Sequence, residues 1–237
     1  MRLDANFWLI RKPIAHRGLW GDSLAENSIP AFNLAIEKGF AIETDLYSTL
    51  DGEIVCVHDK NLLRLTGLDK NVYELTLKEI KSLSLSGSNE KIPTLKQVLS
   101  ACEGKTPLLL EFKNQPDNSY VKRAVEILKD YKGEFAVQSF NPFILRTIKK
   151  LAPEFLRGIL SSKTPDTENK LEKFVVKRMP FNFLCKPQFI SFEYNGLPLK
   201  NRLRKKYPVL AWTVTDKDIL KEISPYCDNI IFENFIP

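Results

Sequence analysis

The segment FAIETDLYSTLDGEIVCVHD, residues 40–59, contains two apolar runs separated by a tight turn. Runs 40–46 and 54–58 have the length and the β-branched content of strands. Asp51-Gly52 lies between them and is a strong signal for a tight hairpin turn. The sequence therefore predicts a β-hairpin in which run 54–58 is an arm added to the preceding strand.

Short apolar runs of the same kind recur along the rest of the chain. They occupy residues 13–16, 107–111, 134–138, 155–159, 188–192, 208–212 and 229–232. Between most of them, apolar residues recur every three or four positions, as in amphipathic helices, at 29–38, 121–131, 143–151 and 217–223. Signals that start a helix precede three of these segments: Ser28 with Pro30, Asn141 with Pro142, and Thr215 with Asp216. Gly39 fits a helix stop.

The order of these elements indicates the fold class. Without the arm at 54–58, about eight strands alternate with helices, which predicts an α/β protein with a (β/α)8 TIM barrel. A doubly wound open sheet is the alternative. Stretch 67–91 departs from the alternation, and we predict a short, loop-like insertion there. No repeat or interdomain linker is evident, so residues 1–237 are predicted to form a single domain.

Composition and charge narrow the class of protein. The chain of 237 residues is 43% hydrophobic, which is typical of a globular protein with a large core. Its four cysteines are scattered without a C-x-x-C pair, so we expect buried thiols and not a zinc or redox site. The net charge of +6 suits an anionic partner without selecting one, and no nucleic acid is expected. The basic cluster at 200–206 is interpreted as a solvated helix face.

The apolar runs also bear on the relation of the chain to membranes. None approaches the roughly 20 residues that a transmembrane helix needs, so any membrane contact would be peripheral. Residues 7–10 are apolar, but they are too few for the core of a secretion signal. We therefore expect a cytoplasmic protein, and the sequence gives no indication of its oligomeric state.

Charged residues lie in or directly after several predicted strands, although a buried parallel strand should be apolar. Glu43 and Asp45 are separated by one residue, so on a strand they project to the same side, about 7 Å apart along it. Glu111 would add a third carboxylate, and oxygen ligands favour Mg²⁺, Ca²⁺ or Mn²⁺ over zinc. The first interpretation is a site for one divalent ion. The alternative is that Glu43 and Asp45 pair with lysines on a solvent-facing edge strand.

The two histidines of the chain occupy matching positions, since His16 and His58 each end an apolar run. Histidine titrates near neutral pH, which suits a general acid and a general base. Arg17 and Lys113 would supply positive charge to a phosphoryl group. These groups together suit hydrolysis of a phosphodiester at the C-terminal ends of the strands, where barrels of this kind have their active sites.

Short motifs that include these residues extend over nearly the whole chain. In order they are His16-Arg17-Gly18, Glu26-Asn27-Ser28, Ala31-Phe32, Glu43-Thr44-Asp45, Val57-His58-Asp59, Leu63-Arg64-Leu65-Thr66, Ile92-Pro93-Thr94-Leu95, Glu111-Phe112-Lys113, Gln138-Ser139-Phe140-Asn141-Pro142 and Trp212-Thr213-Val214. In this order they resemble the glycerophosphodiester phosphodiesterase family.

The resemblance implies a (β/α)8 barrel enzyme of lipid and glycerol metabolism that cleaves glycerophosphodiesters to glycerol 3-phosphate and an alcohol. It also implies a role for each residue of the motifs. The metal ligands are Glu43, Asp45 and Glu111; the catalytic pair is His16 and His58; the phosphate contacts are Arg17 and Lys113; the supporting residues are Glu26, near the metal, and Asn27, which holds its loop and caps a helix. Trp212 would form a wall beside the glycerol, or fill the barrel. His16 is favoured as the base and His58 as the acid, although the two roles are interchangeable.

The sequence departs from the family at its end, where residues 232–237 replace the usual Thr-Asp-x-Pro, and the insertion at 67–91 is modest. Two other functions stay open. A lysophospholipase D-type reaction needs a greasier pocket, for which residues 7–10 would provide an exposed apolar surface. A non-catalytic, basic barrel that binds anionic lipid or nucleic acid would rest on the net charge and on the basic cluster at 200–206. Attack by water and attack by the substrate's own 2-hydroxyl are equally compatible with these residues.

Overall fold

The computed structural model describes residues 3–21, 23–85, 87–165 and 168–237, and within them every predicted strand is present. The strands are β1 (Ile14–His16), β2 (Ala41–Ser48), β3 (Ile54–Cys56), β4 (Leu108–Phe112), β5 (Phe135–Ser139), β6 (Arg157–Ser161), β7 (Phe189–Glu193), β8 (Val209–Val214) and β9 (Asn229–Phe232). They are hydrogen bonded in the order β1-β9-β8-β7-β6-β5-β4-β2-β3, and β1 also pairs with β2. This order closes eight strands on themselves and leaves β3 outside, so the predicted (β/α)8 barrel with an added arm is confirmed.

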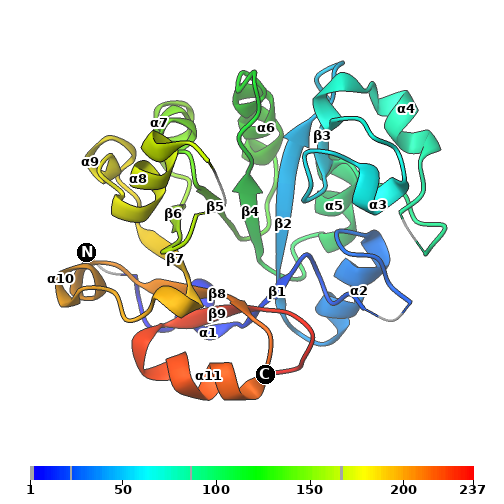
Figure 1. Cartoon of the computed structure of the whole chain (residues 1–237). Helices are drawn as coiled ribbons and strands as arrows, with labels where there is room; N and C mark the ends of the chain where they lie inside the picture. The colour runs from blue at the N-terminus through cyan, green and yellow to red at the C-terminus, as the bar shows by residue number, and fades with distance from the viewer. Residues whose placement is uncertain (1–2, 22, 86, 166–167) are drawn as a thin grey trace. The chain divides into compact units, whose positions relative to one another are not determined.

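Helices alternate with the strands (Figure 1). They are α1 (Trp8–Arg11), α2 (Ile29–Glu37), α3 (Leu63–Thr66), α4 (Leu77–Ser82), α5 (Leu95–Cys102), α6 (Tyr120–Lys129), α7 (Pro142–Leu151), α8 (Lys170–Arg178), α9 (Asn182–Cys185), α10 (Asn201–Lys206) and α11 (Lys217–Ile223), with 3₁₀ turns η1 (Val72–Glu74), η2 (Tyr194–Gly196) and η3 (Ser224–Tyr226). Ser28, Asn141 and Asp216 cap α2, α7 and α11 as predicted. None of the described helices is long and apolar enough to cross a membrane.

The chain divides into two compact units. One is Ala15–Phe135, called here the first-half unit, and the other combines Met1–Ile14 with Ala136–Pro237, called the second-half unit.

In the first-half unit, β2 pairs with β3 on one side and with β4 on the other. The β2–β3 pair is antiparallel, with Leu46 opposite Cys56, and Gly52 in its turn has φ +83°. The β2–β4 pair is parallel and places Asp45 opposite Glu111. Every residue of β2 is buried. The alternative of a solvent-facing edge strand is therefore wrong.

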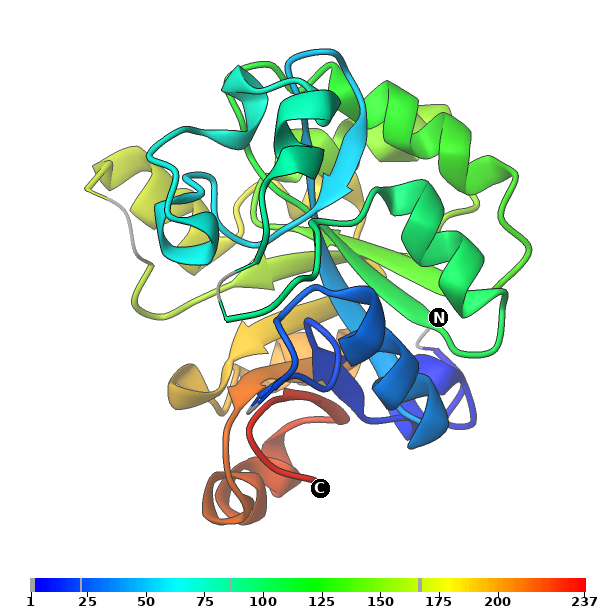
Figure 2. The ribbon, with the colours of Figure 1, turned by 90° about the vertical axis from the view of Figure 1, so that its right-hand side faces the viewer.

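The insertion after β3 is more ordered than a loop, so that prediction needs correction. It contains η1 and α4, and in Figures 1 and 2 the helices α3 and α4 lie beside β3. A separate cluster of buried apolar residues joins the insertion to the hairpin, and it includes Val55, Val57, Leu65, Val72 and Ile80. This apolar cluster, which the polar stretch near Ser82 obscured, gives the segment a small core of its own. Ser86 lies outside the described residues.

In the second-half unit, the N-terminal segment packs against the last strand. Trp8 and Leu9 of α1 are buried, and the Asn229 side-chain amide on β9 donates hydrogen bonds to the backbone oxygens of Leu9 at 2.9 Å and Lys12 at 2.7 Å. The expectation of an exposed apolar start at residues 7–10 is therefore wrong for these two side chains. Their burial removes the feature on which the lysophospholipase D reading relied.

The four cysteines are free thiols, as expected, although only three are fully buried. Cys56, Cys102 and Cys185 are buried, and Cys227 is half-buried. Burial raises the pKa of Cys102 to about 12 and the pKa values of Cys185 and Cys227 to about 11. The pKa of the Cys56 thiol is raised further for the same reason.

Candidate active site

Three carboxylates converge where β2 and β4 run side by side. Glu43 and Asp45 alternate with Thr44 on β2 and therefore share one side of the strand, and Glu111 lies opposite Asp45 on β4. One ligand oxygen from each of the three lies within 4.8 Å of the others, and all three residues are buried. The structure thus brings together the three residues that the sequence assigned to a metal ion.

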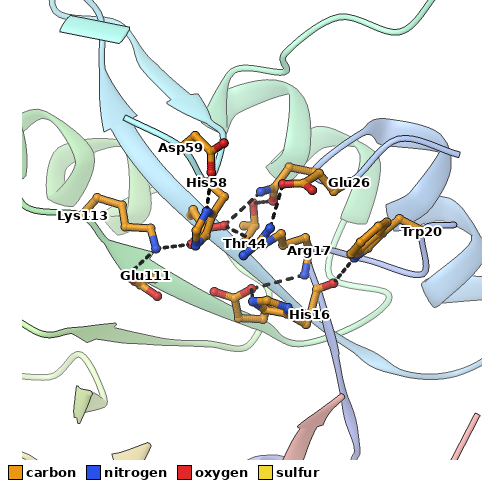
Figure 3. Close-up of polar contacts among 12 residues, drawn as sticks. His16, Arg17, Trp20, Glu26, Thr44, His58, Asp59, Glu111 and Lys113 are labelled. Atoms are coloured by element: carbon orange, nitrogen blue, oxygen red, sulfur yellow. Dashed lines mark hydrogen bonds and ion pairs between the residues drawn. The ribbon is translucent and has the colours of Figure 1, made fainter. Parts of the chain in front are cut away.

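The charges around this cluster are unevenly balanced. The Lys113 ammonium lies 2.8 Å from Asp45 Oδ1 and 2.7 Å from Glu111 Oε1 (Figure 3). Burial favours the neutral form of Asp45, but Lys113 and Arg17 outweigh it and hold the pKa of Asp45 below its usual range. Burial and the carboxylates of Asp45 and Glu111 raise the pKa of Glu43 well above its usual range. With all three carboxylates ionised, the cluster would therefore carry more negative charge than Lys113 and Arg17 neutralise.

A divalent cation fits this arrangement. The donor set consists of carboxylate oxygens, which hard cations such as Mg²⁺, Ca²⁺ and Mn²⁺ prefer. A cation among them would keep Glu43 ionised, and removing it would leave a buried carboxylate beside two others. These ligands suit hard divalent cations as a class and do not select one metal.

The loop after β1 directs Arg17 into the same site. Arg17 has φ +59°, and its backbone N–H donates a hydrogen bond to Glu43 Oε2 at 3.3 Å. Gly18 follows with φ +82°, and a Cβ there would lie 2.9 Å from the backbone carbon of Ala31, so only glycine fits this close approach to α2. The Arg17 guanidinium then reaches Glu26 Oε1 at 2.8 Å and lies 3.8 Å from Asp45 Oδ2.

Glu26 and Asn27 hold this loop against β2. Glu26 is buried and accepts hydrogen bonds from Arg17 and from Arg64. The Asn27 amide donates to Asp45 Oδ2 at 3.0 Å, and its carbonyl accepts from the Thr44 hydroxyl at 2.6 Å. The predicted helix-capping role belongs to Ser28 and not to Asn27, because Ser28 Oγ accepts from the N–H of Ala31. Asn27 instead orients a carboxylate of the cluster.

The two histidines approach the cluster from different elements of the first-half unit. His16 ends β1, and its Nε2 lies 4.0 Å from Glu43 Oε2. Trp20 Nε1 donates to the backbone oxygen of His16 at 3.0 Å. His58 follows β3, and its Nδ1 lies 2.7 Å from Asp59 Oδ1. Asp59 thereby fixes the orientation of the His58 ring and leaves Nε2 as the ring atom that can exchange a proton with a substrate.

Arg64 and Asp59 are residues of this site to which the sequence reasoning assigned no role, and Arg64 connects Asp59 to Glu26. Arg64 donates to both oxygens of Glu26 at 2.8 Å and to both oxygens of Asp59, at 2.6 Å and 3.0 Å. The pKa of Asp59 is below its usual range although burial opposes this, because His58 and Arg64 both bond its carboxylate. The only signal for Arg64 in the sequence is its place in the motif Leu63-Arg64-Leu65-Thr66.

Trp212 lies in the second-half unit, on β8. Its ring contacts Phe140 edge to face, with the ring centroids 5.6 Å apart. A contact of Trp212 with substrate stays a prediction.

Comparisons with known proteins agree with this fold. The model of the glycerophosphoryl diester phosphodiesterase family matches residues 16–231. A glycerophosphodiester phosphodiesterase of Caldanaerobacter subterraneus subsp. tengcongensis is 31% identical, over 93% of this chain and 93% of its own. A solved phosphodiesterase of Oleispira antarctica, in complex with the product sn-glycerol-3-phosphate, has a TM-score of 0.80 and 25% identity, over 95% of this chain and 93% of its own. Human lysophospholipase D GDPD1 is 32% identical over 53% of this chain and 43% of its own length.

Proposed function

Because this chain belongs to the glycerophosphoryl diester phosphodiesterase family, we propose that it cleaves glycerophosphodiesters to glycerol 3-phosphate and an alcohol with one divalent metal ion. The chain is an enzyme of the glycerophosphodiester phosphodiesterase class. The observation that supports metal dependence is the convergence of Glu43, Asp45 and Glu111, in which the pKa of Glu43 is raised and an additional cation would keep Glu43 ionised. Magnesium, calcium and manganese all suit these ligands.

A bound ion would neutralise charge on the phosphoryl oxygens and orient the diester. Arg17 and Lys113 supply further positive charge beside the same carboxylates, so the phosphate is expected between them. A phosphodiester carries a negative charge that would otherwise repel a nucleophile. The basic side chains lower this barrier.

His16 and His58 are proposed to transfer the protons of the reaction. His16, whose Nε2 faces Glu43, is favoured as the base that activates the nucleophile. His58, oriented by Asp59, is favoured as the acid whose Nε2 donates a proton to the leaving alkoxide. The nucleophile is either water or the 2-hydroxyl of the substrate. A substrate that lacks this hydroxyl separates the two routes, since continued turnover excludes obligatory cyclisation.

The central experiment is an assay of glycerol 3-phosphate release from glycerophosphocholine, glycerophosphoethanolamine and glycerophosphoglycerol. The protein is first stripped with a chelator, and Mg²⁺, Ca²⁺ or Mn²⁺ is then added back. We expect activity to disappear with the chelator and to return with at least one ion. An unchanged rate in chelator would refute the role of the metal.

Substitutions then test the residues. We expect His16→Ala, His58→Ala and Glu43→Ala each to lower kcat by about 10² to 10⁴-fold, the range for loss of acid–base or electrostatic catalysis. Glu37→Ala is the matched control, because this carboxylate lies exposed on α2. Full activity of the His16 and Glu43 variants would contradict the proposed site.

A lysophospholipase D-type reaction is the second candidate. It is favoured by the human relative, although that match covers only about half of this chain. Comparing turnover of glycerophosphocholine and lysophosphatidylcholine decides between them, and a strong preference for the lipid would overturn the first choice. A cytoplasmic location stays a prediction.

A further inference from the structure

Helix α8 of the second-half unit exposes large apolar side chains. Leu171 is 70% exposed and Phe174 is 54% exposed, whereas Val176 is the residue that this helix buries. At about 100° per residue, Leu171 and Phe174 point almost directly away from Val176. The helix is therefore apolar on its inner and on its outer side, and packing within the protein explains only the inner side.

Basic side chains form a stripe next to this outer apolar face. Lys170, Lys173 and Lys177 recur at helical spacing and lie together on one flank of α8, and all three are exposed. Arg178 lies on the outer face itself. Glu172 is the one acidic residue in the nine of this helix. Apolar residues bordered by lysines are the pattern of helices that lie flat in the interface of a bilayer.

The neighbouring helices also expose apolar side chains. Helix α9 begins shortly after α8 and packs against α7 (Figure 1). Phe183 of α9 is 69% exposed. Phe143 of α7 is half exposed, and its ring lies 5.3 Å from that of Phe181. Three consecutive helices thus present aromatic or aliphatic side chains to solvent.

We propose that this surface, defined by Leu171, Phe174, Lys170, Lys173 and Lys177, binds an anionic phospholipid bilayer. Leu171 and Phe174 insert among the acyl chains near the headgroups, and the lysines meet the negative headgroups. A second copy of the chain is a poorer occupant, because it carries the same lysine stripe and offers no negative surface to match it. The inference does not depend on the proposed catalytic residues.

Vesicle sedimentation tests the proposal. The wild-type chain is mixed with vesicles of phosphatidylcholine alone, or with vesicles that also contain roughly a third of the anionic lipid phosphatidylglycerol. We expect binding to the anionic vesicles that weakens as salt rises. The variant Leu171→Ser/Phe174→Ser should bind at least about tenfold less, since each side chain loses apolar burial. The charge variant Lys170→Glu/Lys173→Glu/Lys177→Glu should lose the preference for anionic vesicles.

Leu50→Ser is the matched control, because Leu50 is 64% exposed in the turn between β2 and β3. Turnover of soluble glycerophosphocholine should be the same in the α8 variants, which shows that they are folded. If the serine variant loses this activity, it is not folded, and the vesicle binding of the charge variant then decides whether the proposal holds. The proposal is overturned if the wild-type chain ignores anionic vesicles, or if the folded α8 variants bind as well as Leu50→Ser. It is also overturned if the exposed face instead supports a dimer that the serine variant abolishes.

Discussion

At the scale of single residues, Arg64 connects the parts of the active site. It lies on α3, and its side chain is half exposed, so neither burial nor a position on a strand marks it as a functional residue. Yet its guanidinium bonds the carboxylate that orients His58 and the carboxylate that holds Arg17. The sequence identified the residues whose chemistry is obvious. It could not show which neighbouring residue fixes their positions, because that depends on contacts between distant segments.

We predict that Arg64→Met lowers kcat by about 10 to 100-fold, the usual effect of losing a partner that orients an active-site group. KM should change less than kcat, because Arg64 orients His58 through Asp59, whereas Arg17 is held by Glu26, which Arg17 still bonds directly. Arg64→Lys should recover only part of the rate, since a lysine cannot bond two carboxylates in the same planar geometry. Steady-state kinetics check this, with Arg123→Met on α6 as the control. A change confined to KM would contradict the positioning role.

Glu43 is predicted to lower the stability of the metal-free protein. Its carboxylate is buried beside two others, so Glu43→Gln should raise the free energy of unfolding by about 1 kcal/mol. For a chain of this size the melting temperature would rise by about 2–4 °C. Thermal unfolding in chelator measures this effect. Added metal should stabilise the wild type and not the variant, and equal stabilisation of both would remove Glu43 from the ligands.

The contribution of Glu26 to the stability of the fold is predicted to depend on pH. Burial would raise its pKa, but the hydrogen bonds from Arg64 and the charge of Arg17 lower the pKa below the ordinary value. A carboxylate with a lowered pKa stabilises the fold above its unfolded pKa of about 4.3 and loses this effect as the pH falls. Glu26→Gln should therefore be less stable than the wild type at pH 7, and the difference should shrink below about pH 4. Urea unfolding of both proteins at pH 7 and below about pH 4 measures this difference. A difference independent of pH would contradict the charge-based explanation.

At the scale of elements, hydrophobic periodicity predicted the strands and several amphipathic helices, but it missed other helices. All nine strand runs were found, because a buried strand is short, apolar and bounded by turns. Helix α5 was missed although Thr94 and Gln97 form a capping box before it. Helix α8 was missed because its apolar residues lie on opposite sides and do not give one apolar stripe. The hairpin arm was predicted from Asp51-Gly52, where the local turn alone decides the structure.

The insertion owes its order to its own apolar cluster. Ile80 is fully buried within it, and Leu65 of the same cluster is next to Arg64 in the chain. We predict that Ile80→Ala lowers the free energy of unfolding by about 2–5 kcal/mol, the usual cost of such a cavity. Hydrogen exchange should rise across residues 62–85, and kcat should fall with it as Arg64 loses its support. Lys78→Ala on the solvent side of α4 is the control. An unchanged kcat would separate the insertion from catalysis.

At the scale of the whole molecule, the division into two units falls inside regular structure. The chain passes from one unit to the other between Ile14 and Ala15 in β1, and between Phe135 and Ala136 in β5. Domain boundaries normally fall in exposed linkers. Residues 1–237 are therefore still predicted to form a single domain. Thermal unfolding followed by near- and far-ultraviolet circular dichroism should give one coincident transition, and two separated transitions would contradict this.

The burial of the cysteines makes the wild-type chain a ready background for spin labelling. A thiol reacts as its thiolate, and the raised pKa values of Cys102, Cys185 and Cys227 keep that form scarce near neutral pH. A cysteine introduced at exposed position 171 on α8 would therefore accept a nitroxide before the native thiols. The accessibility of that nitroxide to oxygen and to a polar relaxing agent would then report how deeply the helix enters a bilayer.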